Sequence, residues 1–250
     1  MVNRKRSVWS QILASVLVNA VYAMENYPIM FVNTLLSPLS ILIVITFVSH
    51  GMLIGFGIEG ALIMTAVMSG VSMQGDLSHL KNDMKLQDMV VTSPTGPLTY
   101  VAGMGVSEIV FSLPVLVLLV ILASIYIQPT LMQALTILLV IIVMFCFSIA
   151  LGFLLSTLTT DVMQSWGFSG IVSVLLSTIP PVYYPISYIP MPFQYIAYIS
   201  PTTYAAQIAQ AAMGYVSVSK LNLVVDWIVI VAVCIALLVL GYKKARWREP

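Results

Sequence analysis

Charged side chains are scarce in this 250-residue sequence, where Lys, Arg, Asp and Glu make up 8% and hydrophobic residues 60%. A soluble domain typically carries about 25% charged residues. Residues 109–160 contain no charge at all. A charge near the centre of a bilayer costs about 2.5–3.5 kcal/mol even on the mildest scales, so such a chain belongs in lipid. We therefore predict an all-α integral membrane protein, with residues 1–250 forming a single transmembrane domain.

Cysteine and histidine are equally rare, with two of each. Cys146 and Cys234 each lie inside an apolar run, which indicates small core residues and disfavours a disulfide or metal site. The two histidines, His50 and His79, fall on opposite sides of the membrane in the topology predicted below, which argues against a membrane-embedded hydrolase. The sequence contains no Gly-x-x-x-x-Gly-Lys-Ser/Thr, and therefore no phosphate-binding loop of an ATPase. The net charge of +1 gives no indication of nucleic-acid binding.

Apolar runs suited to crossing about 30 Å of hydrocarbon occur six times. We predict transmembrane helices at residues 28–54, 58–74, 103–127, 131–158, 162–179 and 224–242. Lys and Arg orient these helices, because they are enriched in the cytoplasmic segments of membrane proteins. With both termini in the cytoplasm, nine of the ten basic residues lie inside and Lys220 alone lies outside. This asymmetry predicts cytoplasmic N- and C-termini.

Residues 7–26 follow a basic cluster and carry an apolar stripe of their own. The stripe contains Val8, Ile12, Val16 and Ala20, widened by Trp9, Leu13, Leu17 and Met24, with Gln11, Ser15 and Asn19 between. This spacing is typical of an amphipathic helix lying in the membrane interface, with Trp9 at headgroup depth. A seventh span is the alternative, although it would remove the asymmetry of basic residues.

A charged segment, residues 76–97, separates the second and third predicted spans. Leu77, Leu80 and Met84 fall on one side of a short predicted helix. The charged residues Asp76, Lys81, Asp83, Lys85 and Asp88 fall on the other. An amphipathic helix of this kind can dock into a groove on a soluble partner. The alternative is a solvated loop whose charges only keep it out of the membrane.

The segment between the fifth and sixth spans is rich in proline and tyrosine. Residues 180–204 hold six of each and no charge. Proline interrupts a continuous helix, and tyrosine favours the membrane interface. We predict a re-entrant outer helical hairpin over residues 180–214. Its first helix covers residues 192–199; its second begins with Ser200 as N-cap and Pro201 as first helical residue, and stops at Gly214. An interfacial loop without a mechanical role is the alternative.

Together these features resemble the permease of an ATP-binding-cassette exporter of the type-two family, which has the type V fold. That family carries a Leu-x-Asp-x-x-x-x-Ser-Pro pattern between its second and third spans, found here at residues 86–94. Its Pro-x-x-x-x-Pro run matches Pro185 to Pro190, and its Asn-Pro-Leu-Thr-Tyr motif matches residues 200–204, with Ser200 in place of Asn. Gln207 and Gln210 stand where acidic or Arg residues often follow.

The resemblance implies a permease that moves a lipophilic or amphiphilic molecule out across the plasma membrane of a prokaryote. ATP and Mg²⁺ would be bound by a separate nucleotide-binding (ATPase) subunit, with no cofactor in this chain. The other expected partners are membrane lipids and a second permease, either an identical copy or a paralogue. A secondary transporter or channel without an ATPase is the alternative. It is disfavoured because repeated halves and paired intramembrane charges are not evident.

Three groups of residues are candidates for function. We expect coupling to the ATPase through Leu77, Leu80, Lys81, Met84, Lys85, Asp88, Ser93 and Pro94. We expect an outer gate formed by Tyr184, Pro185, Tyr188, Pro190, Ser200, Pro201 and Tyr204. The possible pathway-lining residues are Asn33, Ser37, Ser40, Thr46 and Glu108. The polar residues of the first span could instead satisfy backbone groups freed by Pro38, and Glu108 could instead snorkel to the headgroups.

The remaining acidic residues of the spans are predicted to mark helix boundaries. Glu59 and Asp226 fall at outer helix ends, and Asp161 at an inner turn. We assign none of the three a binding role from sequence.

Overall fold

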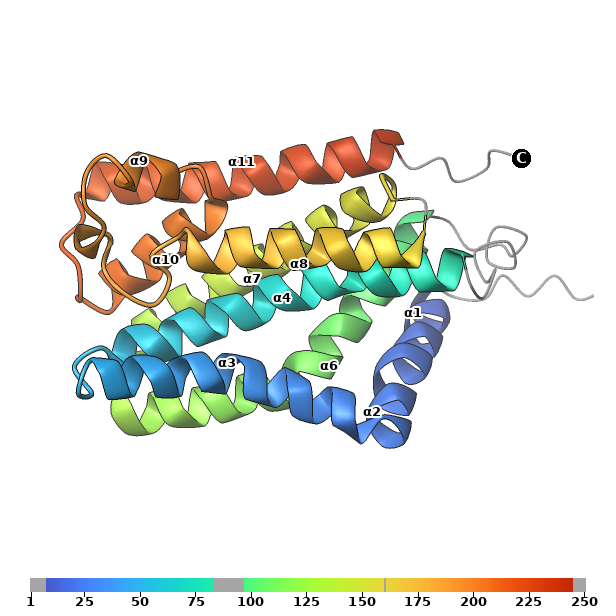
Figure 1. Cartoon of the computed structure of the whole chain (residues 1–250), viewed down its shortest axis with the longest axis horizontal. Helices are drawn as coiled ribbons and strands as arrows, with labels where there is room; N and C mark the ends of the chain where they lie inside the picture. The colour runs from blue at the N-terminus through green and yellow to red at the C-terminus, as the bar shows by residue number, and fades with distance from the viewer. Residues whose placement is uncertain (1–7, 83–96, 160, 245–250) are drawn as a thin grey trace, which may run out of the picture.

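The computed structural model describes residues 8–82, 97–159 and 161–244, and within these ranges every regular element is helical (Figure 1). The N-terminal elements are α1 (Val8–Val16), a π-helical turn (Leu17–Val21) and α2 (Tyr22–Asn26). The long helices are α3 (Pro28–Val48), α4 (Ile54–Asn82), α6 (Pro97–Tyr126), α7 (Leu131–Ser156), α8 (Val162–Thr178) and α11 (Lys220–Lys244). Between α8 and α11 lie a 3₁₀ turn (Ile186–Tyr188), α9 (Gln194–Ala197) and α10 (Pro201–Ala212).

Five helical segments of the described chain are long and apolar enough to cross a membrane. They are Val8–Asn26, Ile54–His79, Thr99–Tyr126, Leu131–Ser156 and Lys220–Lys244. This confirms the prediction of an all-helical, multi-span membrane protein. α3 contributes a shorter apolar stretch, Thr34–Val48, and α8 has 17 residues. The six-span count therefore stays a prediction.

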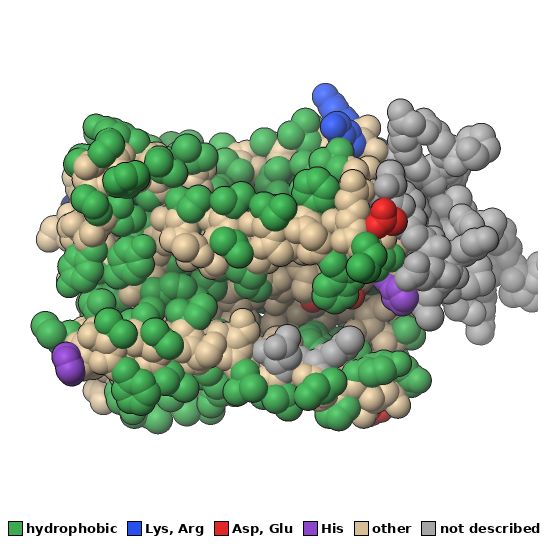
Figure 2. All heavy atoms as spheres, viewed as in Figure 1, with side chains coloured by type: hydrophobic (Ala, Val, Ile, Leu, Met, Phe, Trp, Pro, Cys, Tyr) green, Lys and Arg blue, Asp and Glu red, His purple; other side chains and the backbone are tan. Residues whose placement is uncertain are grey.

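The long helices run back and forth along one axis of the molecule (Figure 1). α3, α4, α6, α7, α8 and α11 alternate in direction, so that the described chain begins and ends at the same end of the bundle. Lys243 and Lys244 lie at that end, in the last turn of α11, and Lys220 begins α11 at the opposite end. Hydrophobic side chains are spread along the length of the face shown in Figure 2, with few charged side chains among them. An apolar exterior of this extent suits lipid rather than water.

α4 and α7 form the core of the bundle, and small residues let them meet backbone to backbone. The contact uses Ala66 and Gly70 on α4 and Ser148 and Gly152 on α7. A Cβ atom on Gly152 would overlap the carbonyl oxygen of Gly70, and one on Gly70 would overlap Ser148. Ser148 Oγ donates a hydrogen bond to the carbonyl oxygen of Ala66 at 2.8 Å. Small residues four apart on both helices are a common means of close packing in membranes.

The N-terminal helix crosses the direction of the bundle (Figure 1) and contacts α6 through its polar side. Asn19 Nδ2 donates to Ser15 Oγ at 3.1 Å, and the Ser15 and Ser107 hydroxyl oxygens lie 3.4 Å apart. A Cβ atom on Gly103 of α6 would touch Ser15. Trp9 and Leu13 of the predicted apolar stripe face outward, 79% and 60% exposed, whereas Ala20 at its other end is buried. An interfacial helix and a seventh span would both place such residues in lipid, and Val8–Asn26 is long enough for either, so the interfacial helix stays a prediction.

Candidate functional site

α10 begins where the sequence predicts, but Ser200 does not cap it as predicted. Pro201 is the first helical residue and Ser200 occupies the N-cap position, yet its side chain makes no capping hydrogen bond. The Ser200 hydroxyl instead lies 2.7 Å from Thr202 Oγ1. Thr202 Oγ1 also donates to the carbonyl oxygen of Leu176 in α8, at 3.2 Å. The hydroxyls at the start of α10 therefore attach the hairpin to α8 rather than stabilise the helix end.

The other end of α10 is a complete Schellman motif, which confirms the predicted stop. Gly214 has φ +78°, a left-handed conformation that favours glycine. The backbone N–H of Tyr215 donates to the carbonyl of Gln210 at 2.9 Å, and that of Gly214 donates to Ala211 at 3.0 Å. Gln133 Nε2, near the start of α7, donates to the carbonyl oxygen of Ala212 at 3.1 Å. Both ends of α10 are thus fixed to long helices.

α10 is buried among α4, α7 and α11, although its 12 residues reach only about 18 Å, too short to cross a bilayer. Two glutamines of α10 donate hydrogen bonds to the proline- and tyrosine-rich segment. Gln210 Nε2 donates to the carbonyl oxygens of Pro181 at 3.2 Å and Tyr184 at 3.4 Å. Gln207 Nε2 donates to the Tyr198 hydroxyl at 3.0 Å. These hydrogen bonds hold that segment against α10. The first predicted helix, residues 192–199, shortens to α9, Gln194–Ala197.

The predicted gate residues occupy different environments in this hairpin. Tyr184 and Pro185 are half-buried, whereas Tyr188 and Pro190 are exposed. Tyr204 is half-buried, and its hydroxyl donates to the carbonyl oxygen of Tyr198 at 2.9 Å. Sequence reasoning missed Tyr183, which is buried against Gly60 of α4 and whose hydroxyl has no hydrogen-bond partner. Burial raises the pKa of Tyr183.

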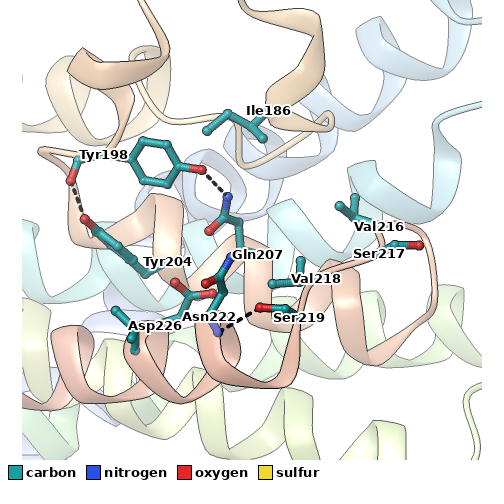
Figure 3. Close-up of a pocket in the computed structure, with 11 residues that line it drawn as sticks. Ile186, Tyr198, Tyr204, Gln207, Val216, Ser217, Val218, Ser219, Asn222 and Asp226 are labelled. Atoms are coloured by element: carbon teal, nitrogen blue, oxygen red, sulfur yellow. Dashed lines mark hydrogen bonds between the residues drawn. The ribbon is translucent and has the colours of Figure 1, made fainter.

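A cavity of about 400 Å³ lies between the hairpin and the start of α11 (Figure 3). Tyr198, Tyr204 and Gln207 line it from the hairpin side, and Asn222 and Asp226 line it from α11. Figure 3 shows Gln207, Asn222 and Asp226 facing the same space. The pKa of Tyr204 is raised by burial first, then by the nearby Asp226 carboxylate and the Tyr198 phenol. The cavity therefore combines aromatic rings, amides and one carboxylate.

Two of the acidic residues predicted as boundary markers are buried inside the fold. Asp226 is only 4% exposed, and its Oδ2 has no hydrogen-bond partner. Glu59 is 1% exposed, and neither of its carboxylate oxygens has a partner. Asp161 does behave as a boundary residue, because it is exposed and accepts a hydrogen bond from the Gln164 backbone at 2.7 Å as the N-cap of α8. Glu59 and Asp226 do lie within the first two turns of α4 and α11, but their burial was not predicted.

The polar residues predicted along the first span bond to their own helix. Ser40 Oγ donates to the Ser37 carbonyl oxygen at 2.8 Å, and Thr46 Oγ1 donates to that of Leu42 at 2.7 Å. Ser37 and Ser40 are exposed on the surface of α3. The Asn33 side chain lies outside the described part of the chain. The hydroxyl groups of Ser40 and Thr46 therefore donate within α3 itself. That the polar residues of this helix line a pathway stays a prediction.

Glu108 of α6 contacts α4 through its carboxylate. Ser72 Oγ donates a hydrogen bond to Glu108 Oε2 at 3.2 Å. The Asp76 carboxyl of α4 lies close to that of Glu108. That Glu108 lines a pathway stays a prediction.

The predicted coupling segment begins inside α4, which continues to Asn82. Leu77 is buried with Met73 and Met104, so in the structure it packs within this chain. Leu80 and Lys81 belong to the last turn of α4. The side chains of these two residues, and all of Met84, Lys85, Asp88, Ser93 and Pro94, lie outside the described part. Coupling to a partner through these residues stays a prediction.

Comparison with known proteins identifies a family. The family model described as ABC-2 type transporter matches residues 11–213, which run from within α1 to the end of α10 and include every long helix except α11. No curated protein matches the chain.

Proposed function

Because the chain belongs to the ABC-2 type transporter family, we propose that it is the permease subunit of an exporter driven by ATP hydrolysis in a separate subunit. The observation that carries the proposal is the family match over residues 11–213 of an all-helical membrane chain. The match agrees with the resemblance seen in the sequence motifs. The ATPase partner would bind ATP and Mg²⁺, and this chain would form the path with a second copy or a paralogue.

The proposed topology has six spans, with both termini in the cytoplasm of a prokaryotic cell. α3 and α8 complete the set of crossing helices, since each runs along the bundle between opposite ends (Figure 1). The N-terminal helix lies in the inner interface, because its apolar side is exposed and it crosses the bundle direction. The hairpin over residues 180–214 then lies at the outer end and enters the membrane only part of the way.

The proposed cargo is lipophilic or amphiphilic and moves outward. Support comes from the composition of the bundle, in which charged side chains are few and the exterior is apolar. Such a protein offers little to replace the hydration shell of an ion or a sugar. The outer hairpin closes the exit of the path in this proposal, since hydroxyl and amide contacts attach α10 to α7, α8 and the 181–184 segment.

Copurification tests the assignment of an ATPase partner. The affinity-tagged chain is purified from its host in mild detergent, and the complex is assayed for ATP hydrolysis. We expect a subunit with a phosphate-binding loop in stoichiometric amount, with activity that depends on its P-loop lysine. Isolation of a chain that transports a solute down an ion gradient without any ATPase would favour the secondary-transporter alternative.

A further inference from the structure

The cavity between the hairpin and α11 contains a buried carboxylate without a partner. Asp226 lies in the second turn of α11, where it is 4% exposed and its Oδ2 has no hydrogen-bond partner. Burying a carboxylate costs free energy unless a hydrogen-bond or charge partner compensates it. Buried carboxylates in native proteins therefore normally have such a partner. The side chain lines the cavity and faces it in Figure 3. Its missing partner therefore has room to come from outside the chain.

Two side-chain donors near this carboxylate bond to other groups. The Tyr204 hydroxyl donates to the carbonyl oxygen of Tyr198, and Gln207 Nε2 donates to the Tyr198 hydroxyl. The backbone N–H of Asn222 donates to Ser219 Oγ. The Asn222 side-chain amide and the Ser217 and Ser219 hydroxyls also line the cavity, beside aromatic faces and apolar side chains. The Tyr198 and Tyr204 ring centroids are 5.8 Å apart and tilted by 53°, and Ile186, Val216 and Val225 also line the cavity.

This combination selects the chemistry of the ligand. Aromatic faces attract cations, and a carboxylate supplies the opposite charge. A metal ion is disfavoured because Ca²⁺ or Mg²⁺ requires several oxygen ligands, and the described residues contain no cluster of three His, Cys, Asp or Glu. A volume of about 400 Å³ suits a small organic molecule. An ammonium group on an apolar body satisfies all of these features.

We infer that the cavity lined by Asp226, Tyr198 and Tyr204 is a binding site for an organic cation. The ammonium group contacts the Asp226 carboxylate and the tyrosine rings, and the apolar body lies along the valines and Ile186. This is a binding property of the chain and does not rest on the proposed transport function. A failure of the binding test leaves that function standing, and a failure to find an ATPase leaves the site standing.

Titration of the purified full-length chain with benzyltrimethylammonium tests the inference. The protein is kept in an uncharged maltoside detergent, and heat of binding is measured at constant ionic strength. Benzyl alcohol, which keeps the ring without the charge, is the ligand control. Asp226→Asn removes the charge at nearly constant shape. Asp161→Asn, at the exposed start of α8, is the matched control variant.

We expect Asp226→Asn to weaken binding of the cation by about tenfold or more, because an opposite charge at close range is lost. Asp161→Asn is expected to stay within about twofold of the original chain, since a distant exposed charge is screened. Tyr204→Leu is expected to weaken cation binding several-fold through loss of a ring face. No cation binding by the original chain, or equal affinity in Asp226→Asn, overturns the inference. Equal loss of both ligands in Asp226→Asn also overturns it.

Two further measurements complete the test, one for a variant that fails to fold and one for the identity of the ligand. If Asp226→Asn does not fold, the Tyr204→Leu titration decides the question, and unchanged cation affinity there overturns the inference. Competition then identifies the source of the ammonium group. Displacement by dihexanoylphosphatidylethanolamine but not by dihexanoylphosphatidylglycerol supports a lipid headgroup as ligand. If neither lipid displaces benzyltrimethylammonium, the result supports a soluble organic cation as ligand. If both lipids displace it equally, the site does not recognise the ammonium group and the inference is overturned.

Discussion

A single methyl group added at Gly152 tests the contact between α4 and α7. In Gly152→Ala the new Cβ would overlap the carbonyl oxygen of Gly70. The obstacle is backbone in the middle of another helix, so it cannot turn away as the end of a flexible side chain could. One of the two helices must shift, and the Ser148 hydrogen bond to the Ala66 carbonyl oxygen shifts with it.

The magnitude follows from two opposing effects. Overpacking a tight interior typically costs about 1–3 kcal/mol. Alanine in place of glycine gains about 0.8–1.0 kcal/mol in a helix interior. We therefore expect a net loss of about 0–2 kcal/mol for Gly152→Ala, toward the upper end because the overlap is with backbone. Gly170→Ala in α8 is the matched control, because nothing lies within 4 Å of its added Cβ. Gly170→Ala gains the higher helix propensity of alanine without an overlap. We therefore expect it to be at least as stable as the original chain.

Thermal unfolding of the purified proteins in one detergent measures the difference. The expected order of Tm is Gly170→Ala at or above the original chain, with Gly152→Ala clearly below it. Comparing two Gly→Ala changes removes any general effect of alanine on membrane helices. A Gly152→Ala protein as stable as Gly170→Ala would show that the helices do not meet backbone to backbone, and the reasoning would be refuted.

Three further predictions concern topology, coupling and the hairpin. In a chain without its native cysteines, Cys introduced at Ser187 and at Lys244, both exposed, should react with an impermeant reagent from opposite faces of the membrane; labelling from one face would contradict the topology. Replacing Leu80 and Met84 with Asp should lower ATPase binding or stimulation without loss of membrane insertion, and unchanged copurification and transport would disprove coupling there. Ser200→Ala should cost about 1 kcal/mol or less by Tm, since its hydroxyl pairs with Thr202 rather than capping α10; a loss near 2 kcal/mol, the upper range for a cap, would indicate a true cap.

The hairpin shows which features could be predicted from local sequence. Pro201 and Gly214 set the ends of α10 through backbone constraints that each residue carries alone, and both ends are where the sequence placed them. The absence of a capping bond from Ser200 was not predictable from local sequence, because the Ser200 hydroxyl pairs with the hydroxyl of Thr202 instead. α9 is shorter than predicted because the flanking residues form turns.

The buried acids show where hydropathy fails. Glu59 and Asp226 interrupt apolar runs, and a charge at the edge of a run is ordinarily taken as the end of a span. Which side of the helix carries the charge, and which helices pack on that side, depends on tertiary contacts absent from a one-dimensional profile. α4 accordingly extends beyond the predicted 58–74, from Ile54 to Asn82.

The contact of α4 and α7 did leave a signal in the sequence. Ala66 and Gly70 are four residues apart, as are Ser148 and Gly152, a spacing typical of closely packed membrane helices. The spacing alone does not say which helix is the partner. That pairing came only from the structure, where the four residues meet.

ATP-driven movement of an amphiphile in proteoliposomes tests the central claim most directly. The chain and its ATPase subunit are reconstituted together, and accumulation of a fluorescent amphiphile is followed in vesicles whose ATPase faces the outside. The account predicts accumulation with ATP, and none when the P-loop lysine of the ATPase subunit is replaced. Accumulation that persists with the inactive ATPase and instead follows an imposed ion gradient would contradict it.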